Sequence, residues 1–190
     1  MNLYDLIKKN RSYRRFIQSE KISREQLLGF VDLARLSASA TNRQPLKFMI
    51  VDDEKGCSRV FPSLRWAGYL KDWDGPTTGE QPSAYIIILG DKNISTNYWV
   101  DHGIAAQSIL LGATEAGFGG CIIASIDLEK LYKEVSLPEH LEILLVIALG
   151  KPGEKVIIDP VNNNDIKYWR DEKDIHHVPK RDLNDLILFI

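Results

Sequence analysis

The stretch Ala84-Tyr85-Ile86-Ile87-Ile88-Leu89-Gly90 is a continuous apolar run that ends on a glycine. Such a run predicts a β-strand buried on both faces, because a strand with one face in water alternates apolar and polar residues. A second run, Ile143-Leu144-Leu145-Val146-Ile147-Ala148-Leu149-Gly150, predicts another strand of this kind. A sheet built on two such strands needs a covering layer on each face, so we expect helices on both sides.

Shorter patterns on either side of these runs define the remaining elements. Apolar residues predict two further strands, at residues 46–51 and 121–124. Apolar residues at helical spacing predict helices over residues 2–9, 24–36, 100–116 and 127–135, and the capping box Ser23-Arg24-Glu25-Gln26 begins the second of them. Because helices and strands alternate, the sequence predicts one α/β or α+β domain over residues 1–190, with a mixed central sheet flanked by helices.

The predicted helix at residues 100–116 has an unusual composition. It carries no charged side chain between Gly103 and Thr114. A helix without a charged face is buried inside a core or against a partner. The sequence leaves both possibilities open.

Composition and charge exclude several classes of protein. The chain has 24 Lys and Arg against 26 Asp and Glu, a net charge of −2, which gives no electrostatic footprint for nucleic acid or an anionic membrane. No apolar run reaches the ~18 residues of a membrane span, and the first residues lack the apolar core of a signal peptide. Two cysteines make no disulfide framework. We therefore expect a cytoplasmic protein that binds neither nucleic acid nor a membrane.

Two stretches have no clear period. Residues 62–82 combine Gly and Pro with the aromatic residues Trp66, Tyr69 and Trp73, and residues 151–181 are polar and rich in turns. Long loops of this kind often serve as lids, binding loops or arms, and we expect residues 151–190 to form an extended C-terminal arm. The first could equally be a surface excursion held in place by its own aromatic side chains.

The sequence offers no nucleophile or metal motif. Cys121 lies in an apolar run, which is typical of a buried structural thiol. His176-His177 has no second Cys/His cluster, so we expect a solvated or hydrogen-bonding pair and no metal site. Gly117-Phe118-Gly119-Gly120 precedes a strand and does not open a helix, so it fails the context test for a dinucleotide fingerprint.

Four polar patches remain as candidates. Arg11-Ser12-Tyr13-Arg14-Arg15-Phe16 brings guanidinium groups, a hydroxyl and backbone N–H groups together, and these could grip a phosphate. Ser37–Pro45 has small residues, and its Asn42 and Gln44 offer donors and acceptors for a heterocycle. The backbone of residues 117–125 could face a planar ring. Lys180-Arg181 adds a basic pair.

The order and spacing of these patches resemble one family over nearly the whole chain: the nitroreductase-like flavin oxidoreductases that bind FMN. Residues 11–16 resemble the family's amino-terminal Arg-Ser-x-Arg-x-Phe element, and residues 39–45 resemble its Ser-x-x-Asn-x-Gln-Pro element. Gly117–Cys121 resembles the glycine-rich turn before the family's flavin-facing strand. Ala148–Pro152 resembles the close of the last core strand, and Lys180-Arg181 resembles the terminal basic element.

The resemblance implies a nitroreductase-type fold and an intertwined homodimer with FMN at the subunit boundary, where the uncharged 103–114 helix would pack. It implies an FMN site in which Arg11, Ser12, Arg14, Lys180 and Arg181 hold the phosphate and ribityl chain. Ser39 and Asn42, with Gln44 nearby, would come from the partner subunit. Ile123, Ala124 and Ser125 would lie along one face of the isoalloxazine ring. Ala124-Ser125 departs from the Glu-Gly pair of well-known bacterial members.

The resemblance further implies that NADH or NADPH gives hydride to the flavin, which passes it to a small electron-poor acceptor such as a nitroaromatic or a quinone. The flavin then carries the chemistry, which agrees with the absence of a catalytic side-chain constellation. Trp66, Tyr69 and Trp73 are candidates to stack on a planar substrate.

Other functions remain open at this point. Within the family, the alternatives are reductive dehalogenation of an aromatic substrate and destruction of the flavin itself. Outside catalysis, the chain could be an FMN-binding or storage module, or an interaction protein without flavin.

Overall fold

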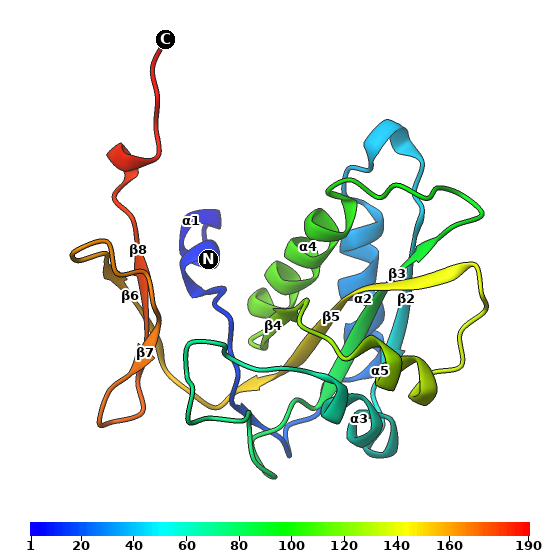
Figure 1. Ribbon diagram of the computed structural model, residues 1–190, viewed down its shortest axis with the longest axis horizontal. Helices are drawn as coiled ribbons and strands as arrows, with labels where there is room; N and C mark the ends of the chain where they lie inside the picture. The colour runs from blue at the N-terminus through cyan, green and yellow to red at the C-terminus, as the bar shows by residue number, and fades with distance from the viewer.

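The computed structural model describes residues 1–190 as a central sheet with helices on both faces and a separate small sheet beside it (Figure 1). The helices are α1 (Leu3–Lys9), α2 (Arg24–Arg35), α3 (Glu54–Val60), α4 (Asp101–Glu115) and α5 (Leu128–Glu134). The strands are β1 (Phe16–Ile17), β2 (Leu46–Val51), β3 (Ala84–Asp91), β4 (Gly119–Ile123), β5 (Leu141–Pro152), β6 (Val156–Pro160), β7 (Trp169–Arg170) and β8 (His176–Lys180). The predicted α+β class is confirmed.

The central sheet is built around the two apolar runs of the sequence. Its order is β1-β5-β3-β2, with β4 on the other side of β5, and every pair in it is antiparallel. All eight residues of β3 are buried. The mixed pattern predicted for the central sheet is found instead in the small sheet, where β6 and β8 pair in parallel and β7 and β8 pair antiparallel.

Alternate residues of β3 enter two separate cores. Ala84, Ile86 and Ile88 pack with α2 and α4, whereas Tyr85, Ile87 and Leu89 pack on the opposite face with Val60 of α3 and Leu131 of α5, among others. The two-residue period of a strand therefore explains why a fully apolar run is required here.

Helix α4 is buried on one side only. Ala105, Ala106 and Ile109 enter the core between α2 and the sheet, while Gly103, Ile104 and Gln107 are exposed. Between Gly103 and Thr114 the exposed face therefore carries no charge, a feature that a helix in contact with water rarely has.

Two segments differ from the sequence prediction. The sequence analysis leaves residues 54–60 unassigned, but they form α3, whose N-terminus is capped by the Asp53 carboxylate accepting from the Gly56 N–H at 2.8 Å. The expected C-terminal arm, residues 151–190, contains the three-stranded sheet β6-β8-β7. These strands are five, five and two residues long, and polar residues and proline interrupt the apolar pattern of the two longer ones.

None of the helices is both long enough and apolar enough to cross a lipid bilayer.

Candidate functional site

The amino-terminal basic segment lies along β4. Tyr13 N–H donates to the Gly120 carbonyl at 3.0 Å, and Ser12 pairs with Gly120 in a parallel bridge. A Cβ on Gly119 would lie 2.5 Å from the Tyr13 ring, so only glycine permits this close approach. The glycine-rich turn thus brings residues 11–14 beside β4, as the family resemblance implies.

Arg11, Ser12 and Arg14 line a cavity of about 390 Å³ together with Lys180 of β8. The other lining residues are Asn10, Gln107, Leu110, Ile122, Tyr168 and Val178. Arg11 and Lys180 are 169 positions apart in the sequence. The two basic segments that contain them therefore meet at one site. Arg181 lies outside this lining and its Nη1 donates to Asn164 Oδ1 at 3.4 Å.

The cavity holds positive charge that no acidic side chain neutralises. Neither Arg11, Arg14 nor Lys180 forms an ion pair in the structure. Arg11 Nη2 donates to the Ile7 carbonyl at 2.8 Å, while its Nε is buried without any partner. Burial lowers the pKa of Arg11, and Tyr13 opposes this shift. Three cations in one hollow, one with an unused buried donor, make a site for an anion.

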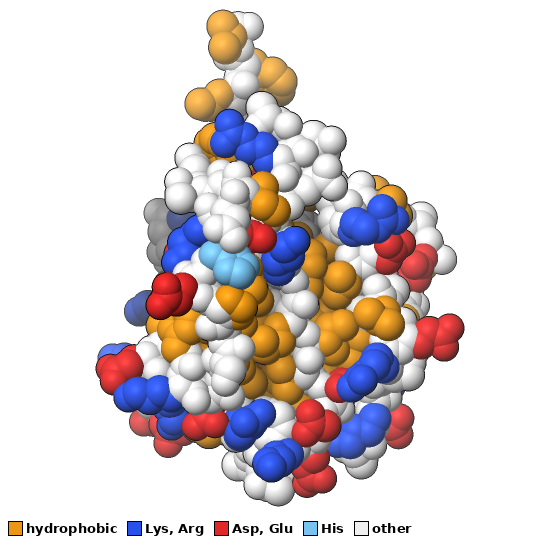
Figure 2. All heavy atoms as spheres, turned by 90° about the vertical axis from the view of Figure 1, so that its right-hand side faces the viewer, with side chains coloured by type: hydrophobic (Ala, Val, Ile, Leu, Met, Phe, Trp, Pro, Cys, Tyr) orange, Lys and Arg blue, Asp and Glu red, His pale blue; other side chains and the backbone are white.

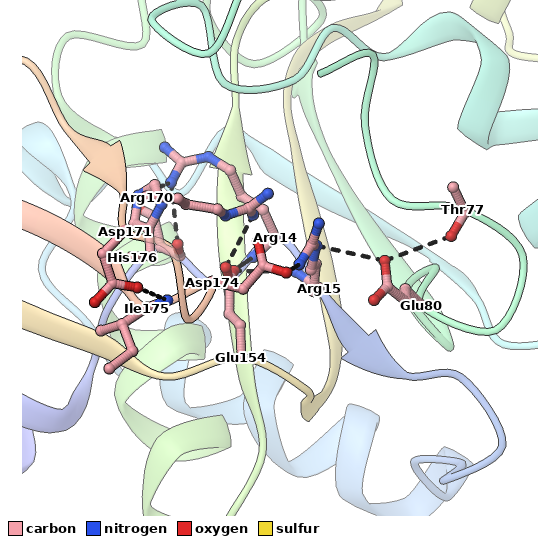
Figure 3. A network of polar contacts seen from close by, with 11 residues as sticks. Arg14, Arg15, Thr77, Glu80, Glu154, Arg170, Asp171, Asp174, Ile175 and His176 are labelled. Atoms are coloured by element: carbon pink, nitrogen blue, oxygen red, sulfur yellow. Dashed lines mark hydrogen bonds and ion pairs between the residues drawn. The ribbon is translucent and has the colours of Figure 1, made fainter. Parts of the chain in front are cut away.

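A buried network holds the backbone of Arg14 in place (Figure 3). The Glu154 side chain is 2% exposed and forms an ion pair at 3.0 Å with Arg170 of β7. Its other oxygen accepts from the backbone N–H of Arg14 and from that of Arg15, the latter at 3.1 Å. The carboxylate is therefore committed to the Arg14 backbone and to Arg170, and the Arg14 guanidinium keeps its charge.

The His176-His177 pair is divided between two environments. His176 is fully buried, so the hydrogen-bonding alternative applies to it: β8 turns this ring toward Arg14, and its Nε2 lies 3.2 Å from Arg14 Nη1. His177 forms the expected hydrogen bonds, with its Nδ1 2.6 Å from Asp159 Oδ2 and its Nε2 3.4 Å from Asp171 Oδ2.

A second hollow adjoins the first and shares Arg14 and Ile122 with it. Ile123, Ala124 and Ser125 form one side, and Trp66 in the 62–82 loop lines it as well. The loop is tied to this strand end because Arg65 N–H donates to the Ser125 carbonyl at 3.0 Å. The predicted phosphate-binding and ring-facing residues are therefore neighbours in space.

The other aromatic residues of the loop pack on the C-terminal sheet region. The Tyr69 ring lies 4.9 Å from that of Tyr168, and Trp73 lies 4.3 Å below the Arg170 guanidinium. Of the three residues proposed to stack on a substrate, only Trp66 lines the second hollow. The contacts of Tyr69 and Trp73 fit the alternative of a loop held by its own aromatics.

Ser39, Asn42 and Gln44 lie elsewhere in the chain. Ser39 Oγ donates to Asp101 Oδ2 at 2.6 Å at the beginning of α4, whereas Asn10 of the cavity contacts Thr114 near its end. Thirteen residues of helix separate these points by about 20 Å. One chain therefore does not bring the two groups together.

The loop that carries these residues has a fixed and strained backbone. Thr41, Asn42 and Gln44 have φ values of 50°, 53° and 52°, in the left-handed region. Gln44 N–H donates to Ser39 Oγ at 2.9 Å, and the Gln44 side chain donates to the Asn42 carbonyl at 3.2 Å. Strain of this kind is commonly found at binding sites.

The cysteines take no part in this arrangement. Cys121 is buried, as predicted, and burial raises its pKa. Burial also raises the pKa of Cys57, to about 11. Both thiols are therefore protonated and weakly reactive at neutral pH.

Three residues that build the site, Glu154, Tyr168 and Arg170, carry no signal in the sequence, and His176 stands out there only as part of the His176-His177 pair. Glu154, Tyr168 and His176 contact Arg14 across 140 to 162 positions of sequence, and Arg170 is joined to it through Glu154. No local pattern signals contacts of this range.

Fold and site together define an α+β protein with a cationic cavity at the edge of its sheet. The model of the nitroreductase family matches residues 7–151. The chain therefore belongs to the nitroreductase family, a class of oxidoreductases.

Individual relatives agree with this assignment. An iodotyrosine deiodinase from Thermotoga neapolitana is 27% identical over 183 residues, covering 87% of this chain and 97% of the relative. A putative NADH dehydrogenase/NAD(P)H nitroreductase from Methanothermobacter thermautotrophicus is 28% identical over 171 residues, 84% of each chain. The crystal structure of a nitroreductase family protein from Clostridium novyi NT matches with a TM-score of 0.66 and 27% identity, over 80% of this chain and 87% of that one.

Proposed function

We propose that this protein is an FMN-dependent oxidoreductase that takes hydride from NADH or NADPH and passes it to a small electron-poor acceptor such as a nitroaromatic or a quinone. The observation that carries this proposal is the un-neutralised group of Arg11, Arg14 and Lys180 in one cavity. A phosphomonoester carries nearly two negative charges at pH 7, and its oxygens suit guanidinium forks.

The residues present fit a flavin mononucleotide. The buried, unpartnered Nε of Arg11 needs an acceptor, and the Ser12 hydroxyl lies in the same lining. Next to this polar end, the second hollow offers six hydrophobic lining residues, among them Ile123 and Ala124, which suit a planar ring. A polar cavity joined to an apolar one matches the two ends of FMN.

Bound FMN would supply the redox chemistry, because its ring accepts and donates hydride. The chain's own groups would bind and orient it. Arg11, Arg14 and Lys180 would hold the phosphate, and Ile123 to Ser125 would support one side of the ring. Trp66 and the loop that it belongs to would limit the access of water and of acceptors. No side chain of this chain is needed as an acid or base.

A homodimer follows from the same proposal, because Ser39, Asn42 and Gln44 would reach the cofactor only from a second copy. Uncovered apolar surface supports it. Leu188 and Phe189, in the tail beyond β8, are 95% and 93% exposed. Figure 2 shows hydrophobic side chains at the tip of this tail and a broad apolar area bordered by charged groups on the body. Such surface is typical of an obligate interface.

The proposal is tested on the purified full-length protein. We expect it to bind FMN more tightly than riboflavin, which lacks the phosphate, and we expect anaerobic NADH or NADPH to bleach the yellow absorbance. If the protein binds FMN but NADH and NADPH do not bleach the yellow absorbance, it would be an FMN-binding module and not a reductase. A protein that takes up no FMN would overturn the proposal and favour an interaction protein.

A second candidate is reductive dehalogenation of an aromatic substrate. The relative from Thermotoga neapolitana, similar over most of both chains, is named an iodotyrosine deiodinase. The reduced protein would be given a nitroaromatic, a quinone and an iodinated phenol in parallel. If iodide is released faster than the nitroaromatic or the quinone is reduced, dehalogenation would be the activity. If the flavin itself is consumed, the activity would be flavin destruction.

A further inference from the structure

Arg14 is held from three sides although no acidic side chain touches its guanidinium. Its Nη1 donates to the Ser12 carbonyl at 3.2 Å, and the guanidinium lies 4.7 Å over the Tyr168 ring. The third contact is to His176, whose Nε2 lies 3.2 Å from the same Nη1. In Figure 3 the His176 ring and the Arg14 side chain lie side by side.

The chemistry of this third contact fixes the state of His176. A guanidinium has only donors, so the His176 Nε2 must accept and the ring proton must sit on Nδ1. That Nδ1 is buried and has no partner of its own. Burial, then the positive charges of Arg14, Arg170 and His177, lower the pKa of His176 to about 4. The ring is therefore neutral at physiological pH.

A neutral acceptor is a specific choice at this position. A carboxylate there would pair with Arg14 and cancel the charge that an anion needs. A cation would repel Arg14. An apolar side chain would leave the guanidinium without an acceptor on that side and free to turn away. The nearby Glu154 carboxylate binds the Arg14 backbone and Arg170 instead.

We infer that His176 is a positioning residue for the cofactor phosphate: as an uncharged acceptor it holds the Arg14 guanidinium toward the cavity and leaves its charge available. This inference rests on the proposed FMN site. It gives the C-terminal sheet a role in binding besides supplying Lys180, because β8 carries both residues on one strand.

The test measures dissociation constants for FMN and riboflavin by flavin fluorescence. His176→Phe keeps a ring of similar size and removes the acceptor, and we expect it to weaken FMN binding about tenfold, the effect of one charge-assisted hydrogen bond. Riboflavin binding should not change. His176→Gln, which restores a neutral acceptor, should recover most of the FMN affinity.

A matched control and a double-mutant cycle separate positioning from general damage. His177→Phe makes the same change one residue along β8, away from Arg14, and should leave FMN affinity near that of the wild type. In the Arg14→Ala background, His176→Phe should cost almost nothing more, because the two residues act as one unit.

Three outcomes would overturn the inference. They are equal losses of FMN and riboflavin binding, a His177→Phe effect as large as that of His176→Phe, and additive effects in the cycle. Failure of the wild-type protein to bind FMN at all would instead remove the proposed function, and the inference with it.

Discussion

At the scale of single residues, His177 shows how the C-terminal sheet depends on pH. Its ring stacks on Trp169 at 4.0 Å and bridges Asp159 of β6 and Asp171 beyond β7. Burial lowers the pKa of His177, but its hydrogen bonds and charge interactions with the two carboxylates outweigh this and raise the pKa above the ordinary 6.5. The pKa of Asp171 is lowered, chiefly by the N–H of Ile175.

The direction of the pH effect follows from these shifts. A raised pKa means that protonated His177 stabilises the fold, fully below pH 6.5 and progressively less as pH rises through the raised value. The contribution of Asp171 is lost at the acidic end, as pH falls through its lowered pKa. We therefore expect urea unfolding to show a larger stability difference between the wild type and His177→Asn at pH 6 than at pH 9. An equal difference at both pH values would contradict this.

At the scale of secondary-structure elements, the bounds of several helices and strands agree with those that the sequence predicts. The bounds of β2 are those predicted, and α2, α4 and β3 agree to within one residue, because each has a strong apolar pattern or a capping box within its own length. α3 and the β6-β8-β7 sheet are not predicted, because α3 has only Cys57 and Val60 as apolar residues, and polar residues and proline interrupt the apolar pattern of β6 and β8. Residues 11–14 could be proposed as an anion site from their own composition, but the contacts of Glu154 and His176 could not be predicted, since they join segments far apart in the sequence.

Glu154 connects three parts of the chain, so a substitution there tests how much the contacts between them stabilise the fold. It links the segment before β1, the turn after β5 and Arg170 of β7. Glu154→Ala would leave the Arg170 charge buried without its partner, which costs roughly 3–5 kcal/mol in the free energy of unfolding. Chemical denaturation measures this loss.

An exposed ion pair provides the control. Glu129 pairs with Lys133 along α5 at 2.7 Å, with both side chains largely in water. We expect Glu129→Ala to change stability by about 0.5 kcal/mol or less. If the two substitutions had equal effects, the structural role given to Glu154 would be wrong.

At the scale of the whole molecule, the question is whether one site draws on two chains. Arg14→Ala damages one half of the proposed site, and Asn42→Gly damages the other without disturbing the left-handed backbone at φ 53°. If the halves come from different subunits, a mixed dimer of the two variants contains one intact site and one doubly damaged site.

Co-expression with two different affinity tags would isolate this mixed dimer. At an FMN concentration near the wild-type dissociation constant, we expect it to bind about half as much FMN as the wild type, and more than either variant alone. If each site were built from a single chain, every site in the mixed dimer would carry one lesion, and no recovery would be seen.

The uncompensated charge of Arg11, Arg14 and Lys180 also has a practical consequence for anyone preparing the protein. A dianion that binds this cavity stabilises the folded protein. Once the site is filled, the gain in the free energy of unfolding grows with the logarithm of the dianion concentration. Inorganic phosphate or sulfate in a purification buffer would thus raise the melting temperature of the protein and, if FMN binds there as proposed, would compete with it. Reconstitution is best carried out in a buffer whose anions are monovalent.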